Sequence, residues 1–236
     1  MKKVLIIGVV FACCFAAKAQ NVLTRKEIYR ASCKAVVQIQ AGNSFGAGFI
    51  TSSDGTIVTA NQVVTTEDSK FRQYASSIKV TVEGHPVPYD ATPVSAQVSE
   101  DQVNFDTAAI KIQAANLPHV TLGSWKTTDV GDQLTILPSW PGLGCLLLEG
   151  TIANKTSFML GSKPADTIIF QSPIRNGFSG SPIFDSRGMV IAIEDTKVFG
   201  ISQSLSALRD QWNASRAAGG RVAIFGIDIP TSKMSR

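Results

Sequence analysis

The residues best suited to chemistry lie in the segment RNGFSGSPIFD at 175–185, which holds Ser179 between two glycines. A nucleophilic serine needs a tight turn that exposes its hydroxyl and directs backbone N–H groups at the oxyanion formed during attack on a carbonyl. Gly177 permits such a turn, and Gly180 leaves room beside the hydroxyl. The segment therefore predicts an acyl-transfer nucleophile, although a Gly/Ser-rich hairpin turn would have a similar composition.

The elements that must position Ser179 are short and rich in β-branched residues. Clusters of Gly, Pro, Asn, Asp and Ser separate these elements, which do not alternate with long helical patterns as βαβ units would. This spacing is typical of an all-β barrel or sandwich. The strand-like runs occur at 35–41, 47–51, 56–60, 77–83, 107–113, 133–137, 145–152, 167–172, 182–185, 189–194 and 198–202.

Two helices are expected at the ends of this β-rich region. Thr24 precedes apolar residues with helical spacing, which predicts a short helix over 24–33. Residues 204–218 carry apolar side chains on one helical face and are followed by two glycines, which predicts a C-terminal helix. A last strand is expected at 221–229.

Residues 1–19 have the layout of a cleaved secretory signal, so a secreted or periplasmic protein is expected. Lys2 and Lys3 precede an apolar run that is too short to anchor the chain in a bilayer, and AKA at 17–19 is a small-x-small cleavage site. Removing the three lysines of this segment lowers the net charge from +4 to +1. The absence of a basic run argues against nucleic-acid binding.

Cys33 and Cys145 are the cysteines that remain once the signal is removed. In an oxidising compartment they could pair, but a bridge requires Cα atoms within about 7 Å, and the sequence leaves the pairing open. No Cys/His cluster has the spacing of metal ligands, so neither a metal nor a cofactor is expected.

Four segments in chain order resemble bacterial trypsin-like serine peptidases, the group that includes the HtrA proteases and the glutamyl endopeptidases. They are GAGFITSSDGTIVTANQVV (46–64), NFDTAAIKI (104–112), PSWPGLG (138–144) and the Ser179 segment. The similarity runs from about residue 35 to residue 208. One such segment alone would be weak support, whereas four in the family's order favour its fold strongly.

This resemblance implies two packed six-stranded antiparallel β-barrels, at about 34–118 and, with the C-terminal helix, about 119–236. It implies that the triad acid is Asp106, from the first barrel, and that the nucleophile is Ser179, from the second. The backbone N–H groups of Gly177 and Ser179 would bind the oxyanion. The residues expected to contact substrate are Phe178 and, on the strand around 198–203, Phe199, Gly200 and Ile201.

Gln62 stands where this family has its general-base histidine. The base must accept the serine proton during attack and return it to the leaving amine. A carboxamide has no protonated state near neutral pH, and losing the histidine of such a triad costs roughly 10⁶ in rate. The two histidines of the chain, His85 and His119, are expected on a turn of the first barrel and on the connection between barrels.

Two functions are compatible with this pattern. The first is an exported pseudoprotease that binds a peptide or protein ligand, as an extended chain, in the cleft between the barrels. The second is an active serine endopeptidase in which Ser179 and Asp106 work with an unconventional base or with one supplied by the substrate. A structural envelope protein would explain the export signal but not the motifs in triad order.

Overall fold

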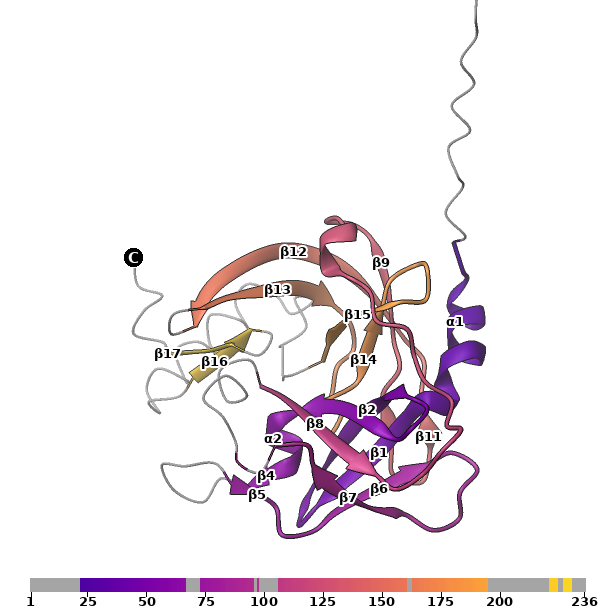
Figure 1. The fold of residues 1–236 in the computed structure, drawn as a ribbon. Helices are drawn as coiled ribbons and strands as arrows, with labels where there is room; N and C mark the ends of the chain where they lie inside the picture. Colours follow the sequence, from indigo (N-terminus) through magenta and orange to yellow (C-terminus); the bar gives the residue numbers. More distant parts are fainter. Residues whose placement is uncertain are drawn as a thin grey trace, which may run out of the picture.

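The computed structural model describes residues 22–66, 73–95, 97, 106–160 and 163–194, and the backbone of two strands at 221–224 and 227–230. The expected signal segment and the expected helix over 204–218 lie outside these ranges. Three residues expected to contact substrate, Phe199, Gly200 and Ile201, lie outside them too. Within the described residues the chain is mostly β (Figure 1).

The described elements fall into a barrel, a second sheet and short connecting pieces. The helical segments are α1 (Arg25–Ser32), η1 (Cys33–Ala35), α2 (Asn61–Val64) and η2 (Trp125–Thr127). The barrel strands are β1 (Val36–Ala41), β2 (Ser44–Ser52), β3 (Thr56–Ala60), β6 (Ile78–Val82), β7 (Tyr89–Pro93) and β8 (Thr107–Ile112). The second sheet contains β9 (Gln133–Ile136), β12 (Leu148–Leu160), β13 (Lys163–Gln171), β14 (Pro182–Phe184) and β15 (Val190–Ile193). Three two-stranded pairs remain: β4 (Thr65–Thr66) with β5 (Gln73–Tyr74), β10 (Ser139–Trp140) with β11 (Gly144–Cys145), and β16 (Arg221–Ile224) with β17 (Ile227–Pro230).

The predicted N-terminal helix is confirmed, with Thr24 as its N-cap. The Glu27 N–H donates to the Thr24 hydroxyl, and the Thr24 N–H donates to the Glu27 carboxylate, which completes a capping box. Ile28 is 1% exposed and packs the helix onto the core. The Leu23 N–H donates to the Ser186 carbonyl at 2.7 Å, so the start of the helix is bonded to the turn between β14 and β15.

Six antiparallel strands close the first barrel in the order β1–β2–β3–β8–β7–β6, as the sequence predicts for this half of the chain. β6 and β8 alternate buried and more exposed residues, which is the pattern of strands with one face in a core. The fully buried residues of this core include Val37, Ile39, Phe49, Ile57, Val80, Ile110 and Ile112. Their packing fixes the end of β3 and the start of β8, where two of the predicted site residues lie.

The second half forms a five-stranded antiparallel sheet in the order β13–β12–β9–β14–β15, where the sequence predicts a closed six-stranded barrel. Closure would need a further strand between the edge strands β13 and β15, and the described residues supply none. β12 and β13 form a long curved hairpin, so the sheet is a curled half-barrel (Figure 1). A register shift between Ile152 and Asn154 contributes to the bend.

A disulfide joins Cys33 and Cys145, which answers the question that the sequence leaves open. Their Cα atoms are 5.9 Å apart, within the range that a bridge requires. The bond connects η1, directly before the first barrel strand, to β11, directly before the hairpin of the second sheet. It therefore links the two halves of the fold.

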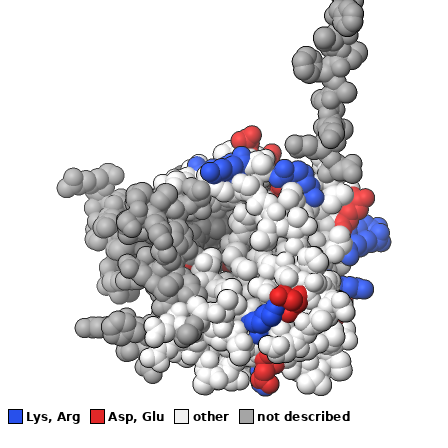
Figure 2. All heavy atoms as spheres, in the orientation of Figure 1, with Lys and Arg blue, Asp and Glu red and all other residues white. Residues whose placement is uncertain are grey.

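The surface shown in Figure 2 carries small groups of basic and acidic side chains with a wide uncharged area between them. Among the helices that the structure describes, none is long and apolar enough to cross a bilayer. In the same residues, no group of three or more His, Cys, Asp or Glu side chains is placed to hold a metal ion.

Candidate active site

The loop between β13 and β14 contains two consecutive hydrogen-bonded turns, at 175–178 and 178–181. In each turn the N–H of the fourth residue donates to the carbonyl of the first at 3.1 Å. The third residues are Gly177 and Gly180, with φ angles of 90° and 89°. A hydrogen-bonded turn with a left-handed glycine in that place has the pattern of a type II turn, and only glycine takes this conformation without strain. Ser179 is the second residue of the second turn.

Backbone hydrogen bonds hold this loop between two strands. The Ala47 N–H, on β2, donates to the Ser179 carbonyl at 2.8 Å. On the other side the Gly180 N–H donates to the Glu194 carbonyl at 2.6 Å, and the Glu194 N–H donates to the Ser181 carbonyl at 2.8 Å. A Cβ atom on Gly180 would lie 2.0 Å from the Ala47 carbonyl oxygen, so the close approach of the two backbones also requires glycine.

Asp106 lies directly before β8 and joins this strand to α2. Its exposed fraction is 9%, and its φ of 42° is left-handed, a conformation that aspartate tolerates better than most residues. The Asp106 Oδ1 accepts a hydrogen bond from the Gln62 N–H at 2.9 Å, and the Asp106 carbonyl accepts one from the Asn61 N–H at 3.0 Å. The carboxylate thus binds the backbone of the residue at the expected base position.

The Gln62 side chain reaches from α2 to the Ser179 hydroxyl. Its Nε2 donates to the Ser179 Oγ at 3.4 Å, which is a long hydrogen bond. Gln62 therefore touches both other predicted positions, Ser179 through its side chain and Asp106 through its backbone N–H. The fold brings these three residues together from α2, the position directly before β8 and the loop before β14.

The direction of the hydrogen bond between Gln62 and Ser179 is opposite to the one that base catalysis needs. An imidazole base accepts the serine proton, whereas here an amide N–H donates to the serine oxygen. A donor that faces the serine oxygen does not take the hydroxyl proton, as a general base does. The contact with the Gln62 amide orients the Ser179 hydroxyl.

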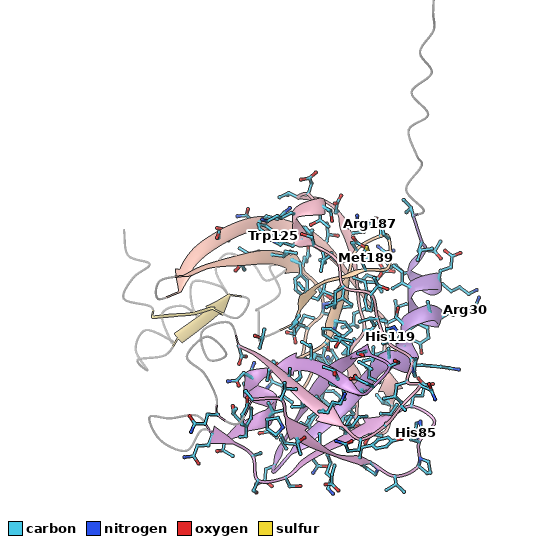
Figure 3. The ribbon with its side chains drawn as sticks, viewed as in Figure 1. Arg30, His85, His119, Trp125, Arg187 and Met189 are labelled. Atoms are coloured by element: carbon cyan, nitrogen blue, oxygen red, sulfur yellow. A yellow bond between two sulfur atoms is a disulfide. The ribbon has the colours of Figure 1, made fainter. Side chains whose placement is uncertain are left out.

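The two histidines lie on loops, as the sequence predicts. The His85 Nδ1 is 2.8 Å from the Tyr89 hydroxyl, next to the turn after β6. The His119 Nδ1 is 3.3 Å from the Leu117 carbonyl, on the connection from β8 to β9. Both labelled side chains lie away from α2, the helix that carries Gln62 (Figure 3).

The sequence predicts that the N–H groups of Gly177 and Ser179 bind an oxyanion. Neither donates to a carbonyl of the described residues, whereas the N–H groups of the intervening Phe178 and of Gly180 both do. The amides of residues 177 and 179 therefore bond to no described carbonyl, and the oxyanion site stays a prediction.

Phe178, which was expected to contact substrate, is 4% exposed, so its ring supports the loop from inside. It packs edge-on against Trp140, with ring centroids 5.6 Å apart. Trp140 packs in the same way against Phe45 at 5.3 Å, and Phe45 is 40% exposed. Trp140 and Phe45 are not predicted as site residues from the sequence. The only signal is that they lie within or just before the motif segments 138–144 and 46–64.

Comparison with known proteins finds relatives over most of the described chain. A family model described as trypsin-like peptidase domain matches residues 46–193. A probable periplasmic serine endoprotease DegP-like from Chlamydia muridarum is 33% identical over 156 residues, covering 66% of this chain and 29% of that protein. A protein of the same description from Pseudomonas putida (strain GB-1) is 27% identical over 150 residues, covering 64% of this chain and 28% of its own length. The match thus spans less than a third of these relatives.

Solved structures share the fold at low sequence identity. Deg5 superimposes with a TM-score of 0.62 at 20% identity, covering 79% of this chain and 91% of that one. The HtrA-type protease AlgW with tripeptide gives 0.61 at 21% identity, covering 84% and 65%. The same protease with decapeptide gives 0.59 at 22% identity, covering 76% and 61%.

Proposed function

Because the chain belongs to the trypsin-like peptidase family, we propose that it is an exported protein of this fold that binds extended peptides beside Ser179 and hydrolyses them poorly. The observation that carries this proposal is the Gln62 amide, which donates a hydrogen bond to the Ser179 hydroxyl. Relatives described as periplasmic support the assignment to an exported compartment.

The loss of proteolysis follows from proton transfer. Attack by Ser179 on an amide must move the hydroxyl proton first to a base and then to the leaving nitrogen, and Gln62 can do neither. The missing histidine is worth roughly 10⁶ in rate, or about 8 kcal/mol of activation free energy. The N–H groups of Gly177 and Ser179 would still polarise a bound carbonyl, and Asp106 would still fix the α2 backbone, but neither replaces the base.

Peptide binding is supported by the sheet edge beside the loop. β15 is the last strand of the described sheet; the segment 121–123 bonds to its first residue, Val190, and its other end leads to Glu194, which is hydrogen-bonded to the loop that carries Ser179. A peptide that adds to such an edge gains backbone hydrogen bonds, as in other strand-addition complexes. The similar AlgW structures are of a protease with a tripeptide and with a decapeptide.

An active endopeptidase is the second candidate function, and the intact turns around Ser179 favour it. In that case a histidine of the substrate would accept the Ser179 proton in place of the missing base. Cleavage would then be restricted to peptides that carry histidine close to the scissile bond.

The decisive experiment restores the base. We expect the purified parent protein to resist fluorophosphonate labelling and to leave casein intact, whereas Gln62→His should label at least about 10²-fold faster, because a positioned general base contributes 10²–10⁴. Gln62→Ala is the matched control, since it removes the amide without supplying a base, and it should stay inert. Ser179→Ala in the Gln62→His background should abolish labelling.

Two outcomes would contradict the proposal. Cleavage by the parent that Ser179→Ala abolishes would establish the endopeptidase instead, and histidine-containing peptides would then identify the base. Failure of a peptide library to bind the Ser179→Ala protein would exclude the peptide-binding role.

A further inference from the structure

The turn at 175–178 decides whether the Gly177 N–H can bind an oxyanion. Type I and type II turns differ by a half-rotation of the central peptide, and this rotation reverses the direction of the N–H of the third residue. The φ of 90° at Gly177 gives the type II pattern, in which that N–H donates to no carbonyl of the described chain. A contact that keeps Gly177 in this conformation therefore also keeps its N–H available to an oxyanion.

Aromatic rings pack directly onto Gly177. A Cβ atom built on it would lie 2.4 Å from the Phe45 Cε2 and 3.0 Å from the Trp140 Cζ3, so both rings are in contact with its α-carbon. Trp140 stands between Phe45 and Phe178, edge-on to each at 5.3 Å and 5.6 Å. The flip turns the peptide between Asn176 and Gly177 about the line that joins their α-carbons, and it swings the Asn176 carbonyl oxygen around that line. Close-packed rings against Gly177 resist the displacement that this swing needs, so they disfavour the flip.

Trp140 belongs to a short hairpin, β10–β11 (residues 139–145), which pairs through only two residues on each side. A hairpin of this length is marginal by itself. Its second strand is tethered twice to the N-terminal segment: Cys145 forms the disulfide with Cys33, and the Cys145 carbonyl accepts a hydrogen bond from the Tyr29 hydroxyl at 3.3 Å. Cys145 also pairs with Ser139, the residue before Trp140.

We infer that Trp140 is a positioning residue that keeps the Gly177 turn in its oxyanion-binding form, and that the Cys33–Cys145 disulfide keeps Trp140 in place. A dithiol reductant would convert the S–S bond to two thiols by supplying two electrons and two protons, becoming a disulfide itself. Reduction would then loosen the hairpin and close the oxyanion site. This inference rests on the proposed function, because it assigns the Gly177 N–H to a bound carbonyl.

The test uses phenylboronic acid as a probe of Ser179 and its oxyanion site. A tetrahedral adduct forms when the serine oxygen bonds to boron and the hydroxyl proton passes to the buffer, and the negative charge of the adduct needs the donors that the turn supplies. The titration measures this equilibrium, so it does not need the general base that fast labelling by a fluorophosphonate needs. The ¹¹B NMR signal moves on conversion from trigonal to tetrahedral boron, and titration of this signal gives the dissociation constant. Ser179→Ala should give no adduct.

We expect Trp140→Ala to weaken the adduct by about 10²-fold, the effect of losing one oxyanion donor. The oxidised parent should form the adduct. The dissociation constant of Trp140→Phe should stay within a few-fold of the parent's, because a ring still covers Gly177. Cys33→Ala/Cys145→Ala and the dithiol-reduced parent should both lose affinity. Leu143→Ala is the control, since Leu143 lies at the tip of the same hairpin and is 69% exposed.

Three results would overturn the inference: unchanged affinity in Trp140→Ala, an equal loss in Leu143→Ala, or no adduct in the oxidised parent. Circular dichroism of each variant separates these results from unfolding. If Trp140→Ala does not fold, the test compares the adduct affinities of the oxidised parent, the reduced parent and Trp140→Phe. Peptide affinity, measured separately, distinguishes failure of this inference from failure of the proposed function, because the boron probe needs only Ser179 and its neighbouring amides.

Discussion

At the residue scale, one hydrogen bond determines what the Ser179 hydroxyl can do. The Gln62 Nε2 occupies a lone pair of the Ser179 oxygen, whereas a working base would take its proton. The rest of the loop is built as a nucleophile would need it, with two left-handed glycines and two N–H groups that bond to no described carbonyl. Under the proposed function, one side chain rather than the backbone limits hydrolysis.

The backbone around Ser179 should tolerate no side chain at position 180. Gly180→Ala places a methyl group 2.0 Å from the Ala47 carbonyl oxygen at a φ of 89°. Overpacking and left-handed strain together should lower the free energy of unfolding by about 2–4 kcal/mol. Urea denaturation measures this loss.

Gly84→Ala is the matched control for Gly180→Ala. Its φ is 82°, but no atom lies within 4 Å of the added methyl group. It carries only the conformational cost, about 1 kcal/mol. Equal losses in the two variants would mean that the contact between the loop and β2 is not as close as the structure places it.

At the element scale, the turn between β2 and β3 is joined to β8 by an ion pair. The Lys111 Nζ lies 2.6 Å from the Asp54 carboxylate, and this contact, followed by hydrogen bonds from Ser52 and Thr56, holds the pKa of Asp54 well below its usual value of 3.8. A carboxyl whose pKa is lowered by folding stabilises the protein above its unfolded pKa and loses that contribution as the pH falls towards the folded pKa.

Asp54→Asn should therefore show a pH-dependent stability difference from the parent. The difference should be constant above about pH 5 and should shrink as the pH falls below 3.8. Thermal melts measure this stability difference between about pH 2.5 and 7, a range that includes the pKa of an ordinary carboxyl group. Lys111→Gln should flatten the same dependence, because it removes the first cause of the shift. A difference that does not vary with pH would exclude the ion pair.

Elements with a strong local pattern are predictable from the sequence, and elements made by tertiary pairing are not. Thr24 and Glu27 predict the start of α1, and the alternation of apolar and polar residues in SIKVTVE predicts β6. β7 is missed because its segment, with a proline directly before it and another at its end, carries no strand pattern. Its pairing with β6 and β8 in a closed barrel compensates for that weak propensity. β12 likewise extends through polar residues because β13 pairs with it along its length.

The candidate site likewise contains residues that the sequence predicts and residues that it does not. Ser179 and Asp106 lie in segments whose residue order is itself a motif, so their positions are predicted before any contact is known. Trp140 and Phe45 come from separate strands, and only the fold brings their rings onto Gly177. Glu194, 1% exposed and bonded to the loop through its backbone, has no sequence pattern that would reveal this contact.

At the scale of the whole molecule, the barrel and the second sheet are joined by the chain and by one covalent cross-link. The disulfide closes a loop of 112 residues between η1 and β11. The sequence cannot predict it, because the distance between the two cysteines depends on how the halves pack. A cross-link over so long a loop removes much of the freedom of the unfolded chain.

Besides loosening the hairpin, removing this cross-link should lower the stability of the whole fold. Cys33→Ala/Cys145→Ala should lower the free energy of unfolding by about 4 kcal/mol, because the unfolded chain regains the entropy of a loop of about 100 residues. The parent reduced with a dithiol should lose a similar amount, which separates the cross-link from the packing of the two side chains. Guanidinium denaturation followed by tryptophan fluorescence and by circular dichroism should give one coincident transition in each protein. An unchanged denaturation midpoint would show that the packing of the two halves, and not the disulfide, holds them together. Two separate transitions would show that the halves unfold independently once the disulfide is removed.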